Sequence, residues 1–394
     1  MRFIAFATAL ISASLVAQTP APKAAPRVFQ MSPAALLQAK VHPSPELLAK
    51  ARHDADSALR QPVPLITAKT QTPPSGDKHD YMSMGAYWWP NPDTPDHKPY
   101  VRHDGLRNPE ATTIPDNLNL WHAVKQSRML ALAYYLTGDE RYAEHAALLL
   151  RTWFITPATA MHPNLEYAQY IPGINVGRGS GILDGSVLPQ VIDAAGMLAG
   201  SPHWTTADEA ALHHWFTDYY VWLTTSKNGM HEYLAPNNHG SWYAEQAGPI
   251  ELYLGKTGAA RARYQAVRTE RIPAQIPADG LQPLEMVRTQ SFSYSAFNLE
   301  ALTLASITAQ QLGVDLFQPV KTGAPGLLTA LDALLPYDAQ HKWPHEQITD
   351  HKEGTLCPAL IIAAAHTHDA KYTDALQRFA CKPTAAQMIQ APPA

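Results

Sequence analysis

The stretch that decides how this chain is organised lies in its second half and reads Ala235-Pro236-Asn237-Asn238-His239-Gly240-Ser241-Trp242-Tyr243. Pro236 favours a turn or the start of a helix, and either of the two asparagines can cap the helix that follows. Asn238 and His239 supply donors that could face a carboxylate, and Trp242 and Tyr243 supply flat apolar rings. Two interpretations stay open from this stretch alone: a helix N-terminus with ordinary caps and a buried aromatic pair, or a binding site.

The composition is that of a globular protein. The chain has 394 residues, 46% of them hydrophobic, which is enough for one large domain or two ordinary ones. The formal net charge is −4, and no basic stripe is present, so we expect no nucleic-acid partner; a polyanion would need a local basic pocket. The 34 prolines favour helices joined by stiff loops, and the 17 tyrosines and 9 tryptophans can line a cleft as well as fill a core.

The N-terminus has the pattern of an export signal. Met1-Arg2 is followed by an apolar run, Phe3 to Val16, and then by small residues. A positive start, a short apolar region and small residues behind it are typical of a secretory signal peptide, and the run is too short for a membrane span. We expect a signal peptide over 1–17, a flexible leader over 18–30 and a single domain over 31–394, in a periplasmic or secreted protein without a membrane span.

The two cysteines, Cys357 and Cys381, leave their state open. An oxidising compartment would allow them to pair and tie down the C-terminal helices, whereas two separate buried thiols fit the sequence equally well. Neither has a neighbouring Cys or His at a ligand spacing, so zinc is not expected there. No Asp/Glu cluster has the spacing of a calcium loop, and we expect neither a metal nor a cofactor.

Helix-period patterns dominate the chain, and strand-like alternation is scarce. Asp116 looks like the N-cap of a helix over 117–136, and Thr137-Gly138-Asp139 ends that helix and caps the next, over 140–154. Further helices are predicted over 184–198, 206–225, 240–254, 259–270, 284–312, 326–335, 355–366 and 369–379. Helices paired through short loops predict an all-α fold, an incomplete α/α toroid, with an irregular helical domain as the alternative.

Two irregular stretches, 81–115 and 156–181, interrupt the helices with many Trp, Tyr, Asn, Arg and Gly residues, which is not the composition of disorder. We expect both to be walls of a cleft. The first contains Tyr87-Trp88-Trp89-Pro90-Asn91-Pro92, which either plugs the helical ring or forms a stacking platform for sugar. The second contains Gln169 and Arg178. Arginine can hold a carboxylate with two parallel hydrogen bonds, although a glycine-flanked arginine can equally be a structural tie.

A third element is the segment 284–300, which contains Arg288 and Tyr294. On one helix they would lie six residues and about 9 Å apart along the axis, so a long arginine and a tyrosine could converge on one pocket. Amides, an imidazole, arginines and a tyrosine, without an obvious carboxylate dyad, suit β-elimination from a uronic acid. Donors at the C6 carboxyl stabilise the enolate-like intermediate that forms when C5 loses its proton, and histidine or tyrosine can move protons.

Taken together, the Asn238-His239 pair, Arg288 with Tyr294, and the 87–92 loop resemble the alginate lyase superfamily of α/α-toroid polysaccharide lyases, in particular families five and thirty-eight. The resemblance runs from about residue 81 to 365. It implies that Asn238 and Arg288 neutralise the substrate carboxylate, that His239 is a base or helps to hold the carboxylate, and that Tyr294 is the acid. The family shares no required metal.

The predicted partner is therefore an anionic polysaccharide, a uronan. Tyr87, Trp88, Trp89, Asn91, Gln169, Arg178, Trp242 and Tyr243 are the candidate substrate-binding residues. Alginate or polymannuronate is the expected substrate, and glucuronan stays open, as do endo or exo action and oligomeric state. Two rival functions remain: a glycoside hydrolase on the same scaffold, which would need two carboxyl groups across the scissile bond, and a non-catalytic exported glycan-binding protein.

Overall fold

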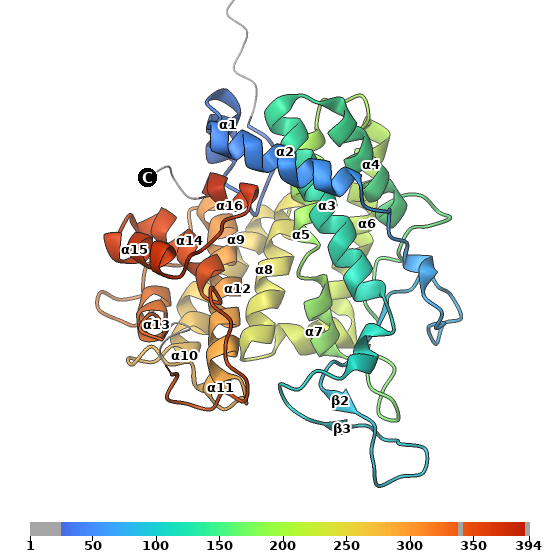
Figure 1. Ribbon diagram of the computed structural model, residues 1–394, viewed down its shortest axis with the longest axis vertical. Coiled ribbons are helices and arrows are strands. Elements are labelled where there is room, and N and C mark those ends of the chain that lie inside the picture. Colours follow the sequence, from blue (N-terminus) through green and yellow to red (C-terminus); the bar gives the residue numbers. More distant parts are fainter. Residues whose placement is uncertain (1–24, 338–341, 391–394) are drawn as a thin grey trace, which may run out of the picture.

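The computed structural model describes residues 25–337 and 342–390. Figure 1 shows a mostly helical molecule in which α8 occupies the middle. The α-helices are α1 Pro33–Val41, α2 Pro45–Leu59, α3 Asp116–Thr137, α4 Glu140–Phe154, α5 Pro189–Leu198, α6 Thr206–Thr225, α7 Lys227–Tyr233, α8 Asn238–Tyr253, α9 Thr257–Ala266, α10 Ile272–Gln275, α11 Pro283–Met286, α12 Ser291–Gln311, α13 Leu327–Leu334, α14 Cys357–Thr367, α15 Ala370–Arg378 and α16 Ala385–Gln390.

Local sequence signals account for several helix boundaries. Asp139 caps α4 by accepting a hydrogen bond from the backbone N–H of Arg141, and Gly138 ends α3 with a positive φ of 76°, as the Thr-Gly-Asp turn predicts. Thr205 and Asp208 form a reciprocal capping box at the start of α6. The helices predicted over 140–154 and 206–225 are confirmed.

The helices form an α/α toroid around α8. Along one flank, α8 contacts α5, which in turn contacts α3; along the other, it contacts α12. Tyr243, Ala247 and Ile250 of α8 belong to a core shared with α2 to α6, whereas Ala244 belongs to a second core shared with α9 and α12 to α15. Because α8 contributes to both cores, its orientation fixes which of its side chains face the inside of the ring. The predicted fold class is confirmed.

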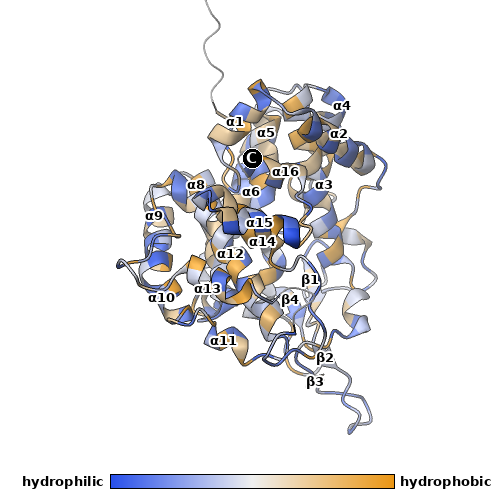
Figure 2. Cartoon of the chain, turned by 60° about the vertical axis from the view of Figure 1, so that its left-hand side comes forward, coloured by the Kyte–Doolittle hydropathy of each residue, from blue (hydrophilic) through white to orange (hydrophobic). Residues whose placement is uncertain are grey.

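Figure 2 shows that hydrophobic and hydrophilic residues occur together on most of the helices. Most residues of α8 and α12 are buried, so these two helices have no separate polar face. Within the described residues, no helix is long and apolar enough to cross a membrane.

The chain enters the fold earlier than the sequence suggests. The predicted signal peptide and residues 18–24 of the predicted leader lie outside the described residues. Val28, Phe29 and Gln30, however, are buried, and the backbone N–H groups of Phe29 and Gln30 donate to Asp193 of α5 at 2.6 and 3.3 Å. The leader predicted to run to residue 30 is therefore corrected: from Val28 onward the segment is packed, because its backbone donors are paired with a buried carboxylate.

Three other helix boundaries differ from the prediction. Pro115, not Asp116, is the N-cap of α3, and the buried carboxylate of Asp116 forms an ion pair with Lys69 at 2.6 Å. The helix predicted over 184–198 begins later, at Pro189 of α5, and its predicted first residues belong to a 3₁₀ turn, Gly179–Gly185. Residues 284–312 form two helices, α11 and α12, with an irregular segment between them. Helical periodicity continues through these breaks, so the pattern alone does not reveal them.

The two irregular stretches are held together by short strands. Strand β1 Met82–Met84 pairs in parallel with β4 Tyr167–Tyr170, and β2 Trp88–Trp89 pairs antiparallel with β3 Val101–Arg102. The first pairing joins the 81–115 stretch to the 156–181 stretch. The two predicted cleft walls therefore form one connected unit beside α3 and α7.

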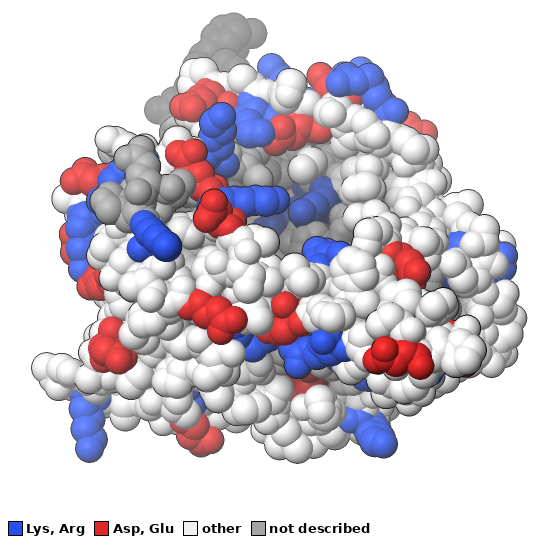
Figure 3. Space-filling model, turned by 60° about the horizontal axis from the view of Figure 1, so that its bottom comes forward, with Lys and Arg blue, Asp and Glu red and all other residues white. Residues whose placement is uncertain are grey.

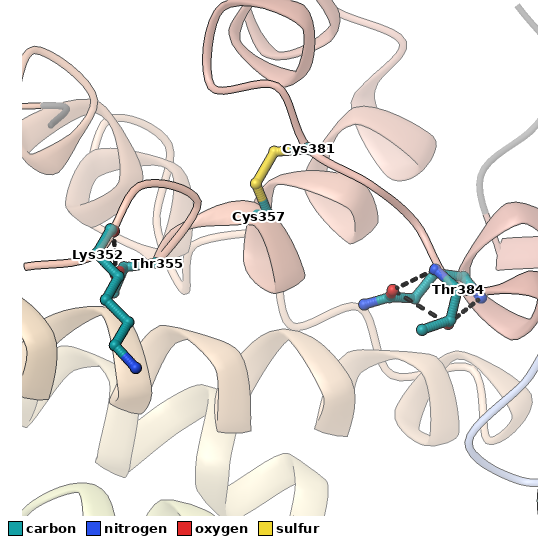
Figure 4. The surroundings of a disulfide bond; sticks show 6 residues. Lys352, Thr355, Cys357, Cys381 and Thr384 are labelled. Carbon is teal, nitrogen blue, oxygen red and sulfur yellow. Dashed lines mark hydrogen bonds between the residues drawn. A yellow bond between two sulfur atoms is a disulfide. The ribbon is translucent and has the colours of Figure 1, made fainter.

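Cys357 and Cys381 form a disulfide (Figure 4). It joins the first residue of α14 to the segment that follows α15, with 5.6 Å between the two Cα atoms. Of the two states that the sequence left open, the paired one is present, and it ties together the C-terminal helices.

Candidate active site

A cleft of about 1220 Å³ opens between the connected loops and the helices α8, α11 and α12. Figure 3 shows the bottom face of the molecule, which is hollowed, with Lys and Arg side chains in and around the hollow. The cleft is lined by four arginines, Arg102, Arg107, Arg178 and Arg288, and by the acidic residues Asp184, Glu232 and Glu300. Asn238, His239, Arg288 and Tyr294 all line this one cleft, so the structure brings the four predicted catalytic residues together.

The turn before α8 sets the position of Asn238 and His239. Gln275 donates to the carbonyls of Pro236 and Asn237 at 2.7 and 3.2 Å, and Arg271 donates to the carbonyl of Ala235 at 2.9 Å. Gly240 is required in the first turn, since a Cβ there would lie 2.2 Å from the Ala235 carbonyl oxygen. The start of α8 is therefore fixed by contacts from α10 and from the π-helical turn Val267–Arg271 that precedes α10.

Asn238 is held by a carboxylate. Its backbone N–H and its side-chain amide donate to the two oxygens of Glu285, each at 2.7 Å. Both side chains are 1% exposed, and burial raises the pKa of Glu285 although the bonds from Asn238 oppose this. One N–H of the Asn238 amide is used in this way, and the second remains for a ligand.

His239 is oriented by a second buried carboxylate. Its Nδ1 lies 2.6 Å from Oε1 of Glu232, which is 1% exposed and belongs to α7. A carboxylate can only accept, so Nδ1 donates and the neutral ring keeps Nε2 without a hydrogen. This is the arrangement in which an imidazole can take a proton at Nε2.

Arg288 lies in the irregular segment between α11 and α12, and Tyr294 lies in the first turn of α12. Nε and Nη2 of Arg288 donate to the two oxygens of Asp104 at 3.0 and 2.7 Å, and its Cζ lies 3.8 Å from the centroid of the Tyr294 ring. Burial would raise the pKa of Asp104, but the bonds and charge of Arg288 hold it well below its usual range. One edge of the guanidinium, formed by Nε and Nη2, is thus occupied, which leaves the edge formed by Nη1 and the second N–H of Nη2 for a substrate.

The phenol of Tyr294 is largely enclosed. Among the described residues its hydroxyl makes no hydrogen bond of good geometry, although the phenol of Tyr87 faces it. Burial raises the pKa of Tyr294 far above its ordinary value, and Tyr87 adds to this effect. The phenol therefore keeps its proton near neutral pH, which suits a proton donor.

The second loop brings an amide and a guanidinium to the same cleft. Arg178 donates through Nη2 to the Gln169 side-chain oxygen at 2.7 Å, and Gln169 donates to Asp184 at 3.0 Å. Asp184 also accepts from Tyr81 at 2.9 Å and from Ser83. Nε of Arg178 has no partner among the described residues, and burial lowers its pKa. Arg178 is thus both a structural tie and a donor at the cleft wall.

Three predicted binding residues do not line the cleft. Trp88 does, but its neighbour Trp89 does not, because successive strand residues face opposite sides. The indole of Trp89 donates instead to the Leu106 carbonyl at 3.1 Å. Asn91 accepts from the backbone of Asp93 at 3.0 Å, in a turn outside the cleft lining.

The prediction that Tyr243 lies in the substrate-binding cleft is also corrected. It is 3% exposed, donates to the Leu223 carbonyl at 3.2 Å and packs near Arg263 on the outer side of α8. One residue advances a helix by about 100°, so Trp242 faces the cleft whereas Tyr243 faces the outer layer. Trp242 lines the cleft but is only 6% exposed, with its ring 4.8 Å from that of Phe297, so it acts as a wall rather than as an open platform.

The sequence interpretation did not identify the three carboxylates that orient the candidate catalytic residues. Glu232, Glu285 and Asp104 orient His239, Asn238 and Arg288 respectively. The last of these contacts joins residues 184 positions apart, and no local pattern marks it. Within the described residues, no group of three or more His, Cys, Asp or Glu side chains has an arrangement that could hold a metal ion.

The comparisons with known proteins identify the family of the chain. A family model described as alginate lyase matches residues 65–343. An alginate lyase from Bacteroides ovatus is 35% identical, with a TM-score of 0.86, over 92% of this chain and 98% of that chain. Two structures of alginate lyase A1-III share the fold: the enzyme from Sphingomonas species A1, with a TM-score of 0.58 at 18% identity, and a variant complexed with tetrasaccharide, with 0.62 at 17%, each over 96% of this chain and 100% of the other.

A search of curated proteins gives no match. The family model spans well over half of the chain, and the Bacteroides structure covers nearly all of it. The buried acid-imidazole pair, the enclosed phenol and the arginine-lined cleft lie inside the matched range. This chain therefore belongs to the alginate lyase family and is a polysaccharide lyase.

Proposed function

We propose that this lyase cleaves alginate, including its mannuronate blocks, by β-elimination in the arginine-lined cleft. The observation that carries the proposal is that His239 and Tyr294, which come from different helices, line the same cleft together with Asn238 and Arg288. Membership of the alginate lyase family supports the reaction class, and the cationic lining suits a polymer with a carboxylate on every residue.

The substrate carboxylate is held by the donors that remain free. Asn238 offers the second N–H of its amide, and Arg288 offers Nη1 together with the second N–H of Nη2, since Glu285 engages the first amide N–H and Asp104 engages Nε and one N–H of Nη2. These donors stabilise the enolate-like charge that develops on the carboxyl group when the C5 proton leaves. The role that the resemblance implies for Arg288 therefore falls to the edge of the guanidinium formed by Nη1 and Nη2.

The proton steps use His239 and Tyr294. The base takes the C5 proton, the C4–O bond breaks as the C4=C5 double bond forms, and Tyr294 gives its proton to the departing glycosidic oxygen. In guluronate the proton and the leaving group lie on opposite faces, and Nε2 of His239 is the base. In mannuronate they lie on the same face, and Tyr294 serves as both base and acid, with His239 assisting. Nε2 of His239 first takes the phenol's proton, and the resulting phenolate then takes the C5 proton and passes it to the departing glycosidic oxygen.

Carbohydrate binding beyond the reacting residue is proposed for Tyr87, Trp88, Gln169 and Arg178. All four line the cleft, and they combine aromatic surface with amide and guanidinium donors. Aromatic rings stack on sugar faces, and a guanidinium can bind a neighbouring carboxylate.

The rival hydrolase would need two available carboxyl groups. Three acidic side chains in and around the cleft are engaged by other groups: Asp104 by Arg288, Glu285 by Asn238, and Asp184 by Tyr81 and Gln169. This occupancy favours elimination, in which carboxylates position other groups rather than react.

The deciding experiment measures ultraviolet absorbance of the unsaturated uronide against polymannuronate, polyguluronate and glucuronan. We expect turnover of the two alginate polymers, its loss in Tyr294→Phe, and a larger loss on polyguluronate than on polymannuronate in His239→Ala. Tyr233→Phe, which removes a phenol outside the cleft, is the matched control and should retain activity. Reducing ends released without absorbance, or full activity in Tyr294→Phe, would contradict the proposal.

We also propose that the protein is exported. The Cys357–Cys381 disulfide supports this, because disulfides persist in oxidising compartments. N-terminal sequencing of the protein recovered from the periplasm or medium should find the chain cut after about residue 17. Recovery of the full-length chain from the cytoplasm alone would oppose this proposal.

A further inference from the structure

The contact between Asp104 and Arg288 goes beyond ordinary surface pairing. Their side chains are 20% and 16% exposed, and the two parallel bonds of 3.0 and 2.7 Å give the bidentate geometry that fixes a guanidinium in one plane. In that plane, Cζ lies 3.8 Å from the centroid of the Tyr294 ring. The carboxylate of Asp104 therefore determines where a cation sits relative to the phenol.

The backbone around Asp104 is attached to the same segment. Thr289 donates through its hydroxyl to the Asp104 carbonyl at 2.8 Å, and Gln290 donates to the Gly105 carbonyl at 2.7 Å. A side chain at Gly105 would meet the Thr289 hydroxyl at 2.6 Å, so the two segments pack without room to spare. We call this set of contacts between residues 104–105 and 288–290 the clasp.

The clasp joins the 81–115 stretch to the segment between α11 and α12. Residues 104–105 follow β3 in the 81–115 stretch, and residues 288–290 connect α11 to α12 (Figure 1). Arg102 adds a bond of 2.5 Å to Asp104 and itself lines the cleft. The loop that carries Tyr87 and Trp88 is thus linked directly to the segment that carries Arg288.

We propose that Asp104 is a positioning residue for the elimination reaction: through the clasp it holds the Arg288 guanidinium over the ring of Tyr294 and makes the 81–115 stretch part of the active site. This inference rests on the proposed function. Asp104 itself is engaged by Arg288, so it acts through that residue and not on the substrate. Misplacing the guanidinium removes charge stabilisation in the transition state more than it removes ground-state binding of a polymer that the other cleft residues still hold.

The test compares Asp104→Asn with the wild-type enzyme on polymannuronate. The asparagine amide has one oxygen, so it cannot accept both hydrogen bonds from Arg288. We therefore expect kcat to fall by about 10- to 100-fold, the size that a small misplacement of the guanidinium produces. KM should change by less than about threefold, the pattern of an interaction made in the transition state. Asp93→Asn, which removes an exposed carboxylate from the same loop, should keep wild-type kcat and KM.

A double variant separates positioning from a general effect of charge or fold. Arg288→Lys cannot be held bidentately, so adding Asp104→Asn to it should cost little further activity if Asp104 acts through Arg288. Asp104→Glu, which keeps the charge with a longer stem, should recover part of the lost kcat. Multiplicative losses in the double variant, or an Asp104→Asn enzyme with unchanged kcat, would overturn the inference. Inactivity of the wild-type enzyme on every uronan would instead refute the proposed function.

Discussion

Replacing Glu245 by glutamine should stabilise the protein, and more so as the pH rises. Glu245 lies on α8, is 1% exposed and accepts a hydrogen bond from the Gln30 amide, while its second oxygen has no partner among the described residues. Burial raises the pKa of Glu245 from its ordinary 4.5 to about 8, and the neighbouring Glu300 adds to this. The folded protein therefore binds this proton more tightly than the unfolded chain does.

The sign and the size of this stabilisation follow from the coupling between proton binding and folding. A raised carboxyl pKa contributes stability that is fully present below pH 4.5 and is lost as the pH rises through about 8, since unfolding then releases the proton. At 1.36 kcal/mol per pKa unit, the ionised side chain makes the folded state roughly 5 kcal/mol less stable than the protonated side chain does. Glutamine stays neutral at every pH and can keep the bond from Gln30, so the variant avoids this loss.

The assay is guanidinium unfolding followed by far-ultraviolet circular dichroism at several pH values from 5 to 9. Glu245→Gln should match the wild type within about 1 kcal/mol at pH 5 and exceed it by about 3–5 kcal/mol at pH 9. Glu144→Gln, which neutralises an exposed carboxylate on α4, should differ from the wild type in free energy of unfolding by an amount that does not depend on pH. A gap between Glu245→Gln and the wild type that is constant or shrinks with rising pH would refute the reasoning.

Three further predictions concern the framework of the site. Lys69→Met leaves the buried Asp116 carboxylate without its ion-pair partner and should lower the free energy of unfolding by about 3–5 kcal/mol in denaturant titrations. Replacing Cys357 and Cys381 by alanine opens a loop with a sequence separation of 24 and should lower the free energy of unfolding by roughly 3 kcal/mol. Adding a reductant to the wild-type protein should lower its free energy of unfolding by the same amount. Gly240→Ala should lower kcat while leaving the far-ultraviolet spectrum unchanged, because its Cβ would clash with the Ala235 carbonyl and displace the start of α8.

Much of the fold was predictable because its signals are local. The Thr-Gly-Asp turn and the Thr205 cap act within one helical turn, and they place the boundaries of α4 and α6 directly. Apolar periodicity identified the helical class, and the Asn-His pair with the later arginine and tyrosine identified the chemistry. These are properties of short stretches, which a sequence displays in full.

Tertiary structure alone decided which groups hold the reactive ones. Glu232 orients His239, and Asp104 reaches Arg288 from 184 residues away, because the toroid and its loops bring distant segments together. It also decided that Trp88 faces the cleft while Trp89 does not, since this depends on the register of β2 against β3. The sequence by itself determined the helices, through local capping and periodicity, and it indicated which side chains are candidates for the reaction. Packing between remote segments determined their orientation, their hydrogen-bond partners and their pKa values, because burial and charge depend on neighbours that sequence distance does not reveal.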